Sequence, residues 1–164
     1  MYIQHMSIRL SPGLGELLRH VSDLVDQGAL RHYQQLGLPY RPRYTPVLRA
    51  LCDGAITVSD ITDRTRLTQG AVSQTISLMA ADGIIERRRL GDGRKSALVI
   101  TAHGRKLLMV LEPHWKHTFA AIDQLEQEIG HPLRTALDAA AQALEQRDFA
   151  TRLLETRQVS GDRS

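Results

Sequence analysis

The sequence has little of several features that other protein classes require. It holds one cysteine, Cys52, in 164 residues, which excludes an internal disulfide and agrees with a reducing compartment. Aromatic residues make up 4 % of the chain, and no run approaches the roughly 20 apolar residues of a membrane span. A secretory signal pattern is also missing. We therefore expect a cytoplasmic protein that has no membrane partner.

Signatures of catalysis and of cofactor binding are missing as well. The sequence has no phosphate-binding glycine loop followed by lysine and no nucleophile elbow, and Gly91-Asp-Gly93 is typical of a tight turn. His114 and His117 fall on one side of a helix, but a structural zinc ion needs four ligands, and exposed polar positions explain the pair equally well. These absences predict a protein that is no enzyme and has neither cofactor nor metal.

Two short helices are predicted in the middle of the chain. Thr57, followed three residues later by Asp60, forms a capping box at the start of the first. Thr68 caps a second helix over 69–82, which Gly83 ends in the left-handed conformation. The apolar period of this second helix predicts the buried positions Val72, Ile76, Met79 and Ala80.

The opposite side of the second helix is small or polar and carries no charge. Its members recur at helical spacing and are Gly70, Ser73, Gln74 and Ser77. Such a stripe can lie in a DNA major groove, where Gln bonds bidentately to adenine and Ser bonds several base edges. The alternative interpretation is an ordinary solvated face.

A basic β-hairpin is predicted to follow. Residues 84–90 and 96–101 are rich in branched apolar side chains, and residues 91–95 turn between them. Residues 84–106 carry seven positive and two negative charges, a net of +5 in a chain whose total is +3. The remainder is therefore at −2, and the positive potential is concentrated at the hairpin, as nucleic-acid binding requires.

In this order and spacing, the segments resemble the DNA-binding core of the multiple-antibiotic-resistance regulator (MarR) family. The resemblance covers 44–108 through Thr45-Pro-Val-Leu-Arg-Ala-Leu51, Thr57-Val-Ser-Asp-Ile61, Leu67-Thr-Gln-Gly-Ala-Val-Ser-Gln74, Asp82-Gly-Ile-Ile-Glu-Arg-Arg88, Asp92-Gly-Arg94 and Ile100-Thr-Ala-His-Gly104. It implies a mainly α fold with a small β-wing. A winged helix-turn-helix core over 44–101 would stand between helical dimerisation regions at 11–37 and 102–157, after a disordered leader at 1–10.

The stripe, the hairpin and the resemblance together predict DNA contacts. We expect base-edge contacts from Gln69, Gly70, Ser73 and Gln74, phosphate contacts from Thr68 and Ser77, and wing contacts from Arg88, Arg94 and Lys95. The resemblance implies that Asp92 orients Arg94, which would enter the minor groove. Gln74 stands where the family often has arginine.

The ends of the chain carry long apolar stripes. Residues 14–36 predict one helix, and Thr101 caps a second that Pro113 either kinks or divides. A last helix begins at Leu133 and reaches Leu154, and the tail from Gln158 is expected to fray. These stripes are too apolar for one slim subunit to cover, so we expect a homodimer.

The connector 38–44 holds two prolines, two tyrosines and two arginines. One interpretation is a pocket for a small aromatic or anionic effector, lined by Tyr33, Tyr40, Tyr44 and Trp115. The other is a linker whose tyrosines cover a helix junction.

Thr45 is expected to cap the next helix with Pro46 as its first residue. Cys52 is expected to be buried, because it lies on the apolar face of that helix. It is not expected to be a redox sensor, since such a cysteine needs a thiolate that nearby positive charge stabilises.

The sequence thus predicts a dimeric, sequence-specific DNA-binding transcription regulator, a repressor that a small molecule releases from a pseudo-palindromic operator. Two alternatives remain open. One is a winged-helix protein-interaction adaptor, and the other is an architectural protein that coats DNA without selectivity.

Overall fold

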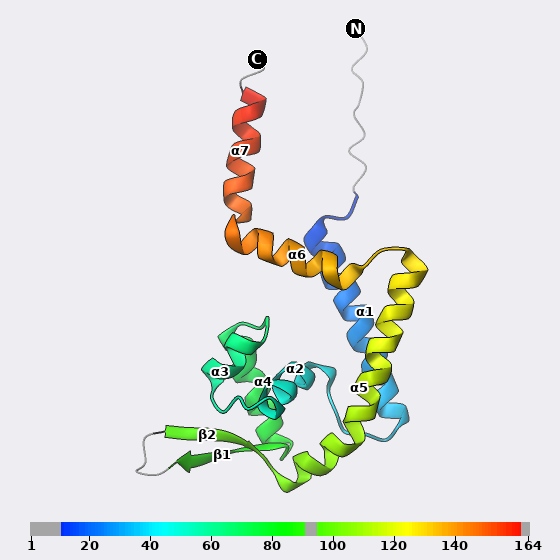
Figure 1. The fold of residues 1–164 in the computed structure, drawn as a ribbon, viewed down its shortest axis with the longest axis vertical. Coiled ribbons are helices and arrows are strands. Elements are labelled where there is room, and N and C mark those ends of the chain that lie inside the picture. The colour runs from blue at the N-terminus through cyan, green and yellow to red at the C-terminus, as the bar shows by residue number, and fades with distance from the viewer. Residues whose placement is uncertain (1–10, 91–94, 162–164) are drawn as a thin grey trace. The chain divides into compact units, whose positions relative to one another are not determined.

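The computed structural model describes residues 11–90 and 95–161, with side chains for 11–89 and 96–157 (Figure 1). The predicted leader at 1–10 lies outside these residues, as do Asp92 and Arg94 of the predicted wing tip. The chain forms two compact units that divide after Leu108. Along the two described stretches, none of the helices combines the length and the apolar character needed to cross a bilayer.

The described residues are mainly helical and contain one antiparallel strand pair. In chain order the elements are α1 (Leu14–Gln35), η1 (a 3-10 turn, Pro42–Tyr44), α2 (Thr45–Cys52), α3 (Val58–Arg64), α4 (Gln69–Ala81), β1 (Ile85–Leu90), β2 (Lys95–Ile100), α5 (Ala102–Ile129), α6 (Leu133–Gln146) and α7 (Phe149–Gly161). The order of α2 to β2 is that of a winged helix-turn-helix, so the predicted fold class is confirmed.

The caps that define the helix-turn-helix form as predicted. The hydroxyl of Thr57 accepts from the Asp60 amide at 3.1 Å, and the Asp60 carboxylate accepts from the Thr57 amide at 2.9 Å. The Ile56 amide also donates to the Asp60 carboxylate, at 3.0 Å, and this bond, together with those to Thr57, holds the pKa of Asp60 below its usual range. At the next turn the Thr68 hydroxyl accepts from the Ala71 amide at 3.2 Å and begins α4. Both helices therefore start at residues that the sequence identifies.

The core of the first unit lies under α4. Val72, Ile76 and Met79 are buried as predicted, but Ala80 is exposed, and Thr75 is buried in its place. The prediction was wrong at Ala80, and the buried side of α4 instead follows residues 72, 75, 76 and 79 at helical spacing.

Two expectations for α2 are wrong. Thr45 is the first residue of the helix and the N-cap is Tyr44, because the 3-10 turn runs directly into α2. The Thr45 hydroxyl instead pairs with the hydroxyl of Tyr40 at 2.9 Å. Cys52 is exposed, since α2 ends at this residue and the side chain lies at the helix end.

The hairpin pairs Ile85 with Ile100 and Arg88 with Ala97 in antiparallel register. The hydroxyl of Thr101 then accepts from the Gly104 amide at 3.0 Å, so Thr101 caps α5 as predicted. The helix stays continuous through Pro113 to Ile129, and the division allowed for at this proline does not occur.

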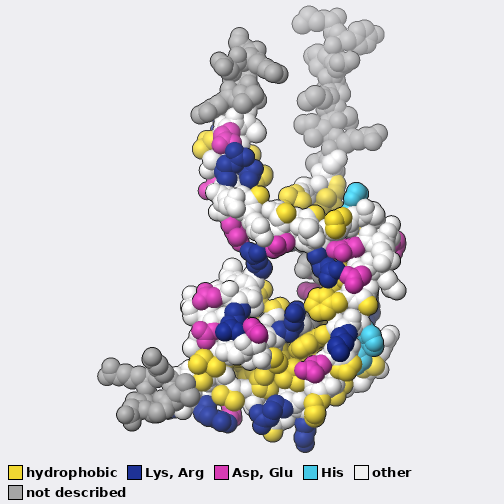
Figure 2. Space-filling view, viewed as in Figure 1, with side chains coloured by type: hydrophobic (Ala, Val, Ile, Leu, Met, Phe, Trp, Pro, Cys, Tyr) yellow, Lys and Arg dark blue, Asp and Glu magenta, His cyan; other side chains and the backbone are white. Residues whose placement is uncertain are grey.

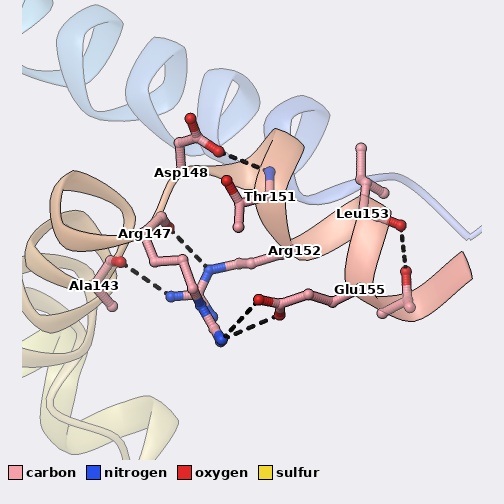
Figure 3. Close-up of polar contacts among 8 residues, drawn as sticks. Ala143, Arg147, Asp148, Thr151, Arg152, Leu153 and Glu155 are labelled. Carbon is pink, nitrogen blue, oxygen red and sulfur yellow. Dashed lines mark hydrogen bonds and ion pairs between the residues drawn. The ribbon is translucent and has the colours of Figure 1, made fainter. Parts of the chain in front are cut away.

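The end of the chain folds as two helices where one was expected. α6 stops at Gln146, and Asp148 accepts from the Thr151 amide at 2.7 Å to begin α7 (Figure 3). Arg152 donates to the carbonyl of Ala143 at 3.0 Å and so joins the two helices. The tail that was expected to fray from Gln158 is helical as far as Gly161, and residues 162–164 lie outside the described residues. The helix ends at Gln146 because Asp148 offers the backbone an alternative hydrogen bond.

Candidate nucleic-acid interface

The predicted reading stripe lies on the outer side of α4. Gln69, Gly70, Gln74 and Ser77 are exposed and Ser73 is half-buried. The Ser77 hydroxyl donates to the Ser73 carbonyl at 3.0 Å, which leaves its oxygen lone pairs facing outward. Thr68 uses its oxygen as the cap of α4 and keeps its hydroxyl proton for another acceptor. The structure thus brings the predicted α4 residues to one accessible surface.

Basic side chains of the hairpin follow α4 directly. Arg87, Arg88 and Arg89 are all exposed on β1, and Arg88 pairs with Glu86 at 2.7 Å. Figure 2 shows Lys and Arg side chains along the lower edge of the view, in the region of the hairpin and the start of α5. The predicted contacts of Asp92, Arg94 and the Lys95 side chain lie outside the described residues.

The connector, residues 38–44, contacts α4 and its C-terminal end through polar side chains, and the sequence did not reveal these contacts. Arg43 donates to the side-chain oxygen of Gln74 at 3.0 Å. At the C-terminal end of α4, the Tyr44 hydroxyl donates to Asp82 at 2.7 Å, and the Arg41 guanidinium lies 3.6 Å from the same carboxylate. A carboxylate at a helix C-terminus is unfavourable beside the helix dipole, and the hydrogen bond from Tyr44 and the ion pair with Arg41 compensate for it.

The predicted effector tyrosines form an aromatic cluster. The Tyr33 and Tyr40 rings meet edge to face at 5.0 Å, and the Tyr40 and Tyr44 rings do so at 5.9 Å. All three side chains are buried. Trp115 is half-buried on α5, in the second compact unit.

A pocket of about 730 Å³ lies beside this cluster, between the connector and α1. Its polar lining is mixed in charge and consists of Asp26, Gln27, Gln34, Arg41, Arg43, Asp82 and His103. Tyr40 also lines it. Burial and the nearby Asp23 raise the pKa of Asp26. The pocket therefore combines an aromatic wall with two guanidinium groups.

The phenol of Tyr44 is expected to ionise at a higher pH than an ordinary tyrosine. Burial, together with the hydrogen bond to Asp82, raises its pKa from 10.0 to about 12. Because the folded state favours the neutral phenol, this contribution to stability is complete below pH 10 and is lost as the pH rises toward about 12. Ultraviolet titration should show one of the four tyrosines ionising near pH 12. The step should vanish in Tyr44→Phe; its persistence there would assign it to another tyrosine.

The two histidines considered as metal ligands lie with ring centroids 6.2 Å apart on α5. Among the residues that the structure describes, no three histidine, cysteine or carboxylate side chains gather where they could hold a metal ion.

Comparisons with known proteins show what this arrangement is similar to. A sequence model described as MarR family matches residues 36–96. The fold is similar to that of MepR from S. aureus, solved in complex with DNA, at 18 % identity and a TM-score of 0.62 over 82 % of this chain and 100 % of that one. The structure of MosR from M. tuberculosis in complex with DNA is 21 % identical in sequence. It matches with a TM-score of 0.62 over 82 % of this chain and 98 % of that chain.

A further similar structure is that of BpsR from Bordetella bronchiseptica, whose DNA binding is regulated by 6-hydroxynicotinic acid. It is 21 % identical, with a TM-score of 0.56 over 84 % of this chain and 96 % of that chain. A search of curated proteins gave no match. Residues 36–96 thus match the MarR family model, and the structure has the winged-helix fold of solved MarR family regulators.

Proposed function

We propose that this protein is a transcription regulator that binds duplex DNA with sequence selectivity. The observation that carries the proposal is the exposed, uncharged stripe of α4, followed directly by three exposed arginines on β1. An uncharged polar helix face can reach base edges without repelling phosphates, and the adjacent cations supply the sequence-independent attraction. The DNA complexes of MepR and MosR, which have a similar fold, support the same function here.

The individual roles follow from chemistry and position. Gln69, Gly70, Ser73 and Gln74 approach base edges, while Thr68 and Ser77 contact phosphates. Arg88, Lys95 and Arg94 act from the wing, with Asp92 orienting Arg94. Phosphate contacts fix the register of the helix on DNA, and only the base-edge contacts select sequence.

The protein acts as a homodimer through its terminal helices, within residues 11–37 and 102–157. One side of α1 is apolar along its length, and Leu14, Leu17, Leu18, Val21, Leu24 and Val25 are between 40 % and 65 % exposed. A second copy would bury these side chains and present a second α4. Two such helices read half-sites about one helical turn apart, as a pseudo-palindromic operator requires.

The change Leu24→Glu is expected to abolish this dimer. Leu24 is 55 % exposed in the single chain, and a carboxylate would be desolvated there by the second copy. Sedimentation equilibrium should give the dimer mass for the wild type and the monomer mass for the variant, with unchanged far-ultraviolet circular dichroism. An undiminished dimer in the variant would place the interface elsewhere.

The pocket beside the tyrosine cluster receives a small aromatic anion, which releases a repressor from DNA. Arg41 and Arg43 attract the negative charge, and Tyr40 contacts the ring. Arg43 also bonds Gln74 of α4, so a ligand that takes this guanidinium changes the reading surface directly. Regulation of BpsR by 6-hydroxynicotinic acid supports this ligand class. The ligand acts only by binding one state of the dimer more tightly.

Selection from a randomised duplex pool tests the proposed function. The protein is expected to enrich one pseudo-palindromic site and to bind it at least about 1,000-fold more tightly than random duplex, the lower range for specific DNA-binding proteins. Equal affinity for all duplexes would instead indicate an architectural protein. Absence of DNA binding would favour the adaptor.

A further inference from the structure

Arg43 and Gln74 form a hydrogen bond between the connector and the predicted reading stripe. The guanidinium nitrogen of Arg43 lies 3.0 Å from the side-chain oxygen of Gln74, although the two residues stand 31 positions apart. Both side chains are exposed, so both are accessible at the surface that α4 would turn to a duplex. The bond connects a cation of η1 to one of the proposed base-reading groups.

The chemistry of the pair fixes which way the amide of Gln74 faces. A guanidinium carries only donors, so the oxygen of the amide must face it. The oxygen and the nitrogen are on opposite sides of the same planar group. With the oxygen turned to Arg43, the amide nitrogen and its two hydrogens are directed away from the connector.

The orientation of the amide determines which base edge suits it. Bidentate recognition of adenine uses both atoms of the amide, since its oxygen accepts from N6 and its nitrogen donates to N7. Guanine presents two acceptors in the major groove, O6 and N7, and thymine presents O4. An outward-facing NH₂ group matches these acceptor edges, whereas at adenine it can donate only to N7 and faces the N6 amine, which is left without an acceptor.

We propose that Arg43 is a positioning residue that holds Gln74 as a hydrogen-bond donor and thereby directs it to guanine or thymine instead of adenine. This proposal rests on the proposed DNA-binding function. It replaces the bidentate contact with adenine that the sequence alone suggests for a glutamine. Arg43 thus takes part in sequence selection without touching the base.

Base preference in the full-length protein tests the proposal. Site selection with Gln74→Ala first identifies the position that Gln74 reads, where the preference should disappear. At that position the wild type should favour guanine or thymine. In Arg43→Met, which keeps the unbranched apolar stem but has no donor, preference should shift toward adenine by about 10-fold, within the range of a bidentate contact.

Arg43→Lys provides a matched control, because an ammonium group restores the donor and should return preference toward that of the wild type. Thermal unfolding of each variant separates this effect from a loss of structure. A wild-type preference for adenine at the Gln74 position overturns the proposal, as does an Arg43→Met variant that loses affinity equally for every sequence. A wild type that enriches no site overturns the proposed function together with this proposal, whereas an unchanged preference in Arg43→Met overturns this proposal alone.

Discussion

Replacing Gly104 with alanine is expected to lower the free energy of unfolding by about 3 kcal/mol, at the upper end of the cost of overpacking. A Cβ atom built on Gly104 would stand 2.2 Å from the carbonyl oxygen of Ile84 and 2.8 Å from the Ile100 side chain. The oxygen belongs to the backbone and cannot rotate away. It also accepts from the Thr101 amide at 3.0 Å, so moving it would weaken the junction between the hairpin and α5.

Gly28→Ala is the matched control for this prediction. Gly28 lies inside α1, and a Cβ atom there would meet nothing within 4 Å. Alanine should therefore raise the free energy of unfolding by up to about 1 kcal/mol, the difference in helix propensity. Urea unfolding of the two variants measures both effects. Equal stability of Gly104→Ala and the wild type would show that the helix can move away from Ile84.

The parts of the fold that the sequence predicts are those whose causes lie close together in the chain. Thr57 and Asp60 are three residues apart, and their capping box forms as predicted. The apolar period of α4 likewise identifies Val72, Ile76 and Met79 as buried. In each case one or two turns of helix contain the whole physical argument, so no knowledge of tertiary packing is needed.

The errors occur where an element ends or where a partner comes from elsewhere in the chain. Cys52 follows the apolar period of α2, but the helix ends at this residue and leaves it exposed. Thr75 stands at the helical spacing of Val72, Ile76 and Met79, but its side chain is polar, so the apolar pattern alone does not mark it as buried. At the chain end, Asp148 could have been recognised as a capping residue, since Thr151 stands three residues later.

The same reasoning explains what was missed at the candidate interface. The cationic and aromatic character of the connector is evident in the sequence, but the partners of Arg43 and Tyr44 lie 31 and 38 residues away. Spacing within one helix carries no information about such pairs. The sequence therefore predicts which face of α4 would read DNA, and the structure adds the contacts of the connector with α4.

Gln69→Glu is expected to reduce affinity for the selected DNA site by at least about 30-fold while leaving the fold intact. Gln69 is the first residue of α4 and is exposed. Glutamate is nearly isosteric, and its charge beside the N-terminus of a helix should stabilise α4 by about 0.3–1 kcal/mol. On DNA the same carboxylate would repel phosphates and would have no hydrogen to donate to a base. Loss of one base contact, at about 2 kcal/mol, accounts for the predicted 30-fold.

The substitution is expected to raise the stability of α4 and to lower the affinity for DNA. Because the two effects have opposite signs, a loss of affinity can be assigned to DNA contact. A misfolded variant would lose stability together with affinity, whereas Gln69→Glu should unfold at the same or a higher temperature than the wild type. Gln35→Glu adds the same charge at the exposed end of α1, and it should leave affinity within about twofold of the wild type because it lies off the reading stripe. Fluorescence anisotropy with the selected duplex at fixed ionic strength compares the three proteins. An equal loss of DNA affinity in both glutamate variants would indicate a response to net charge alone. Gln69 would then not contact the bases.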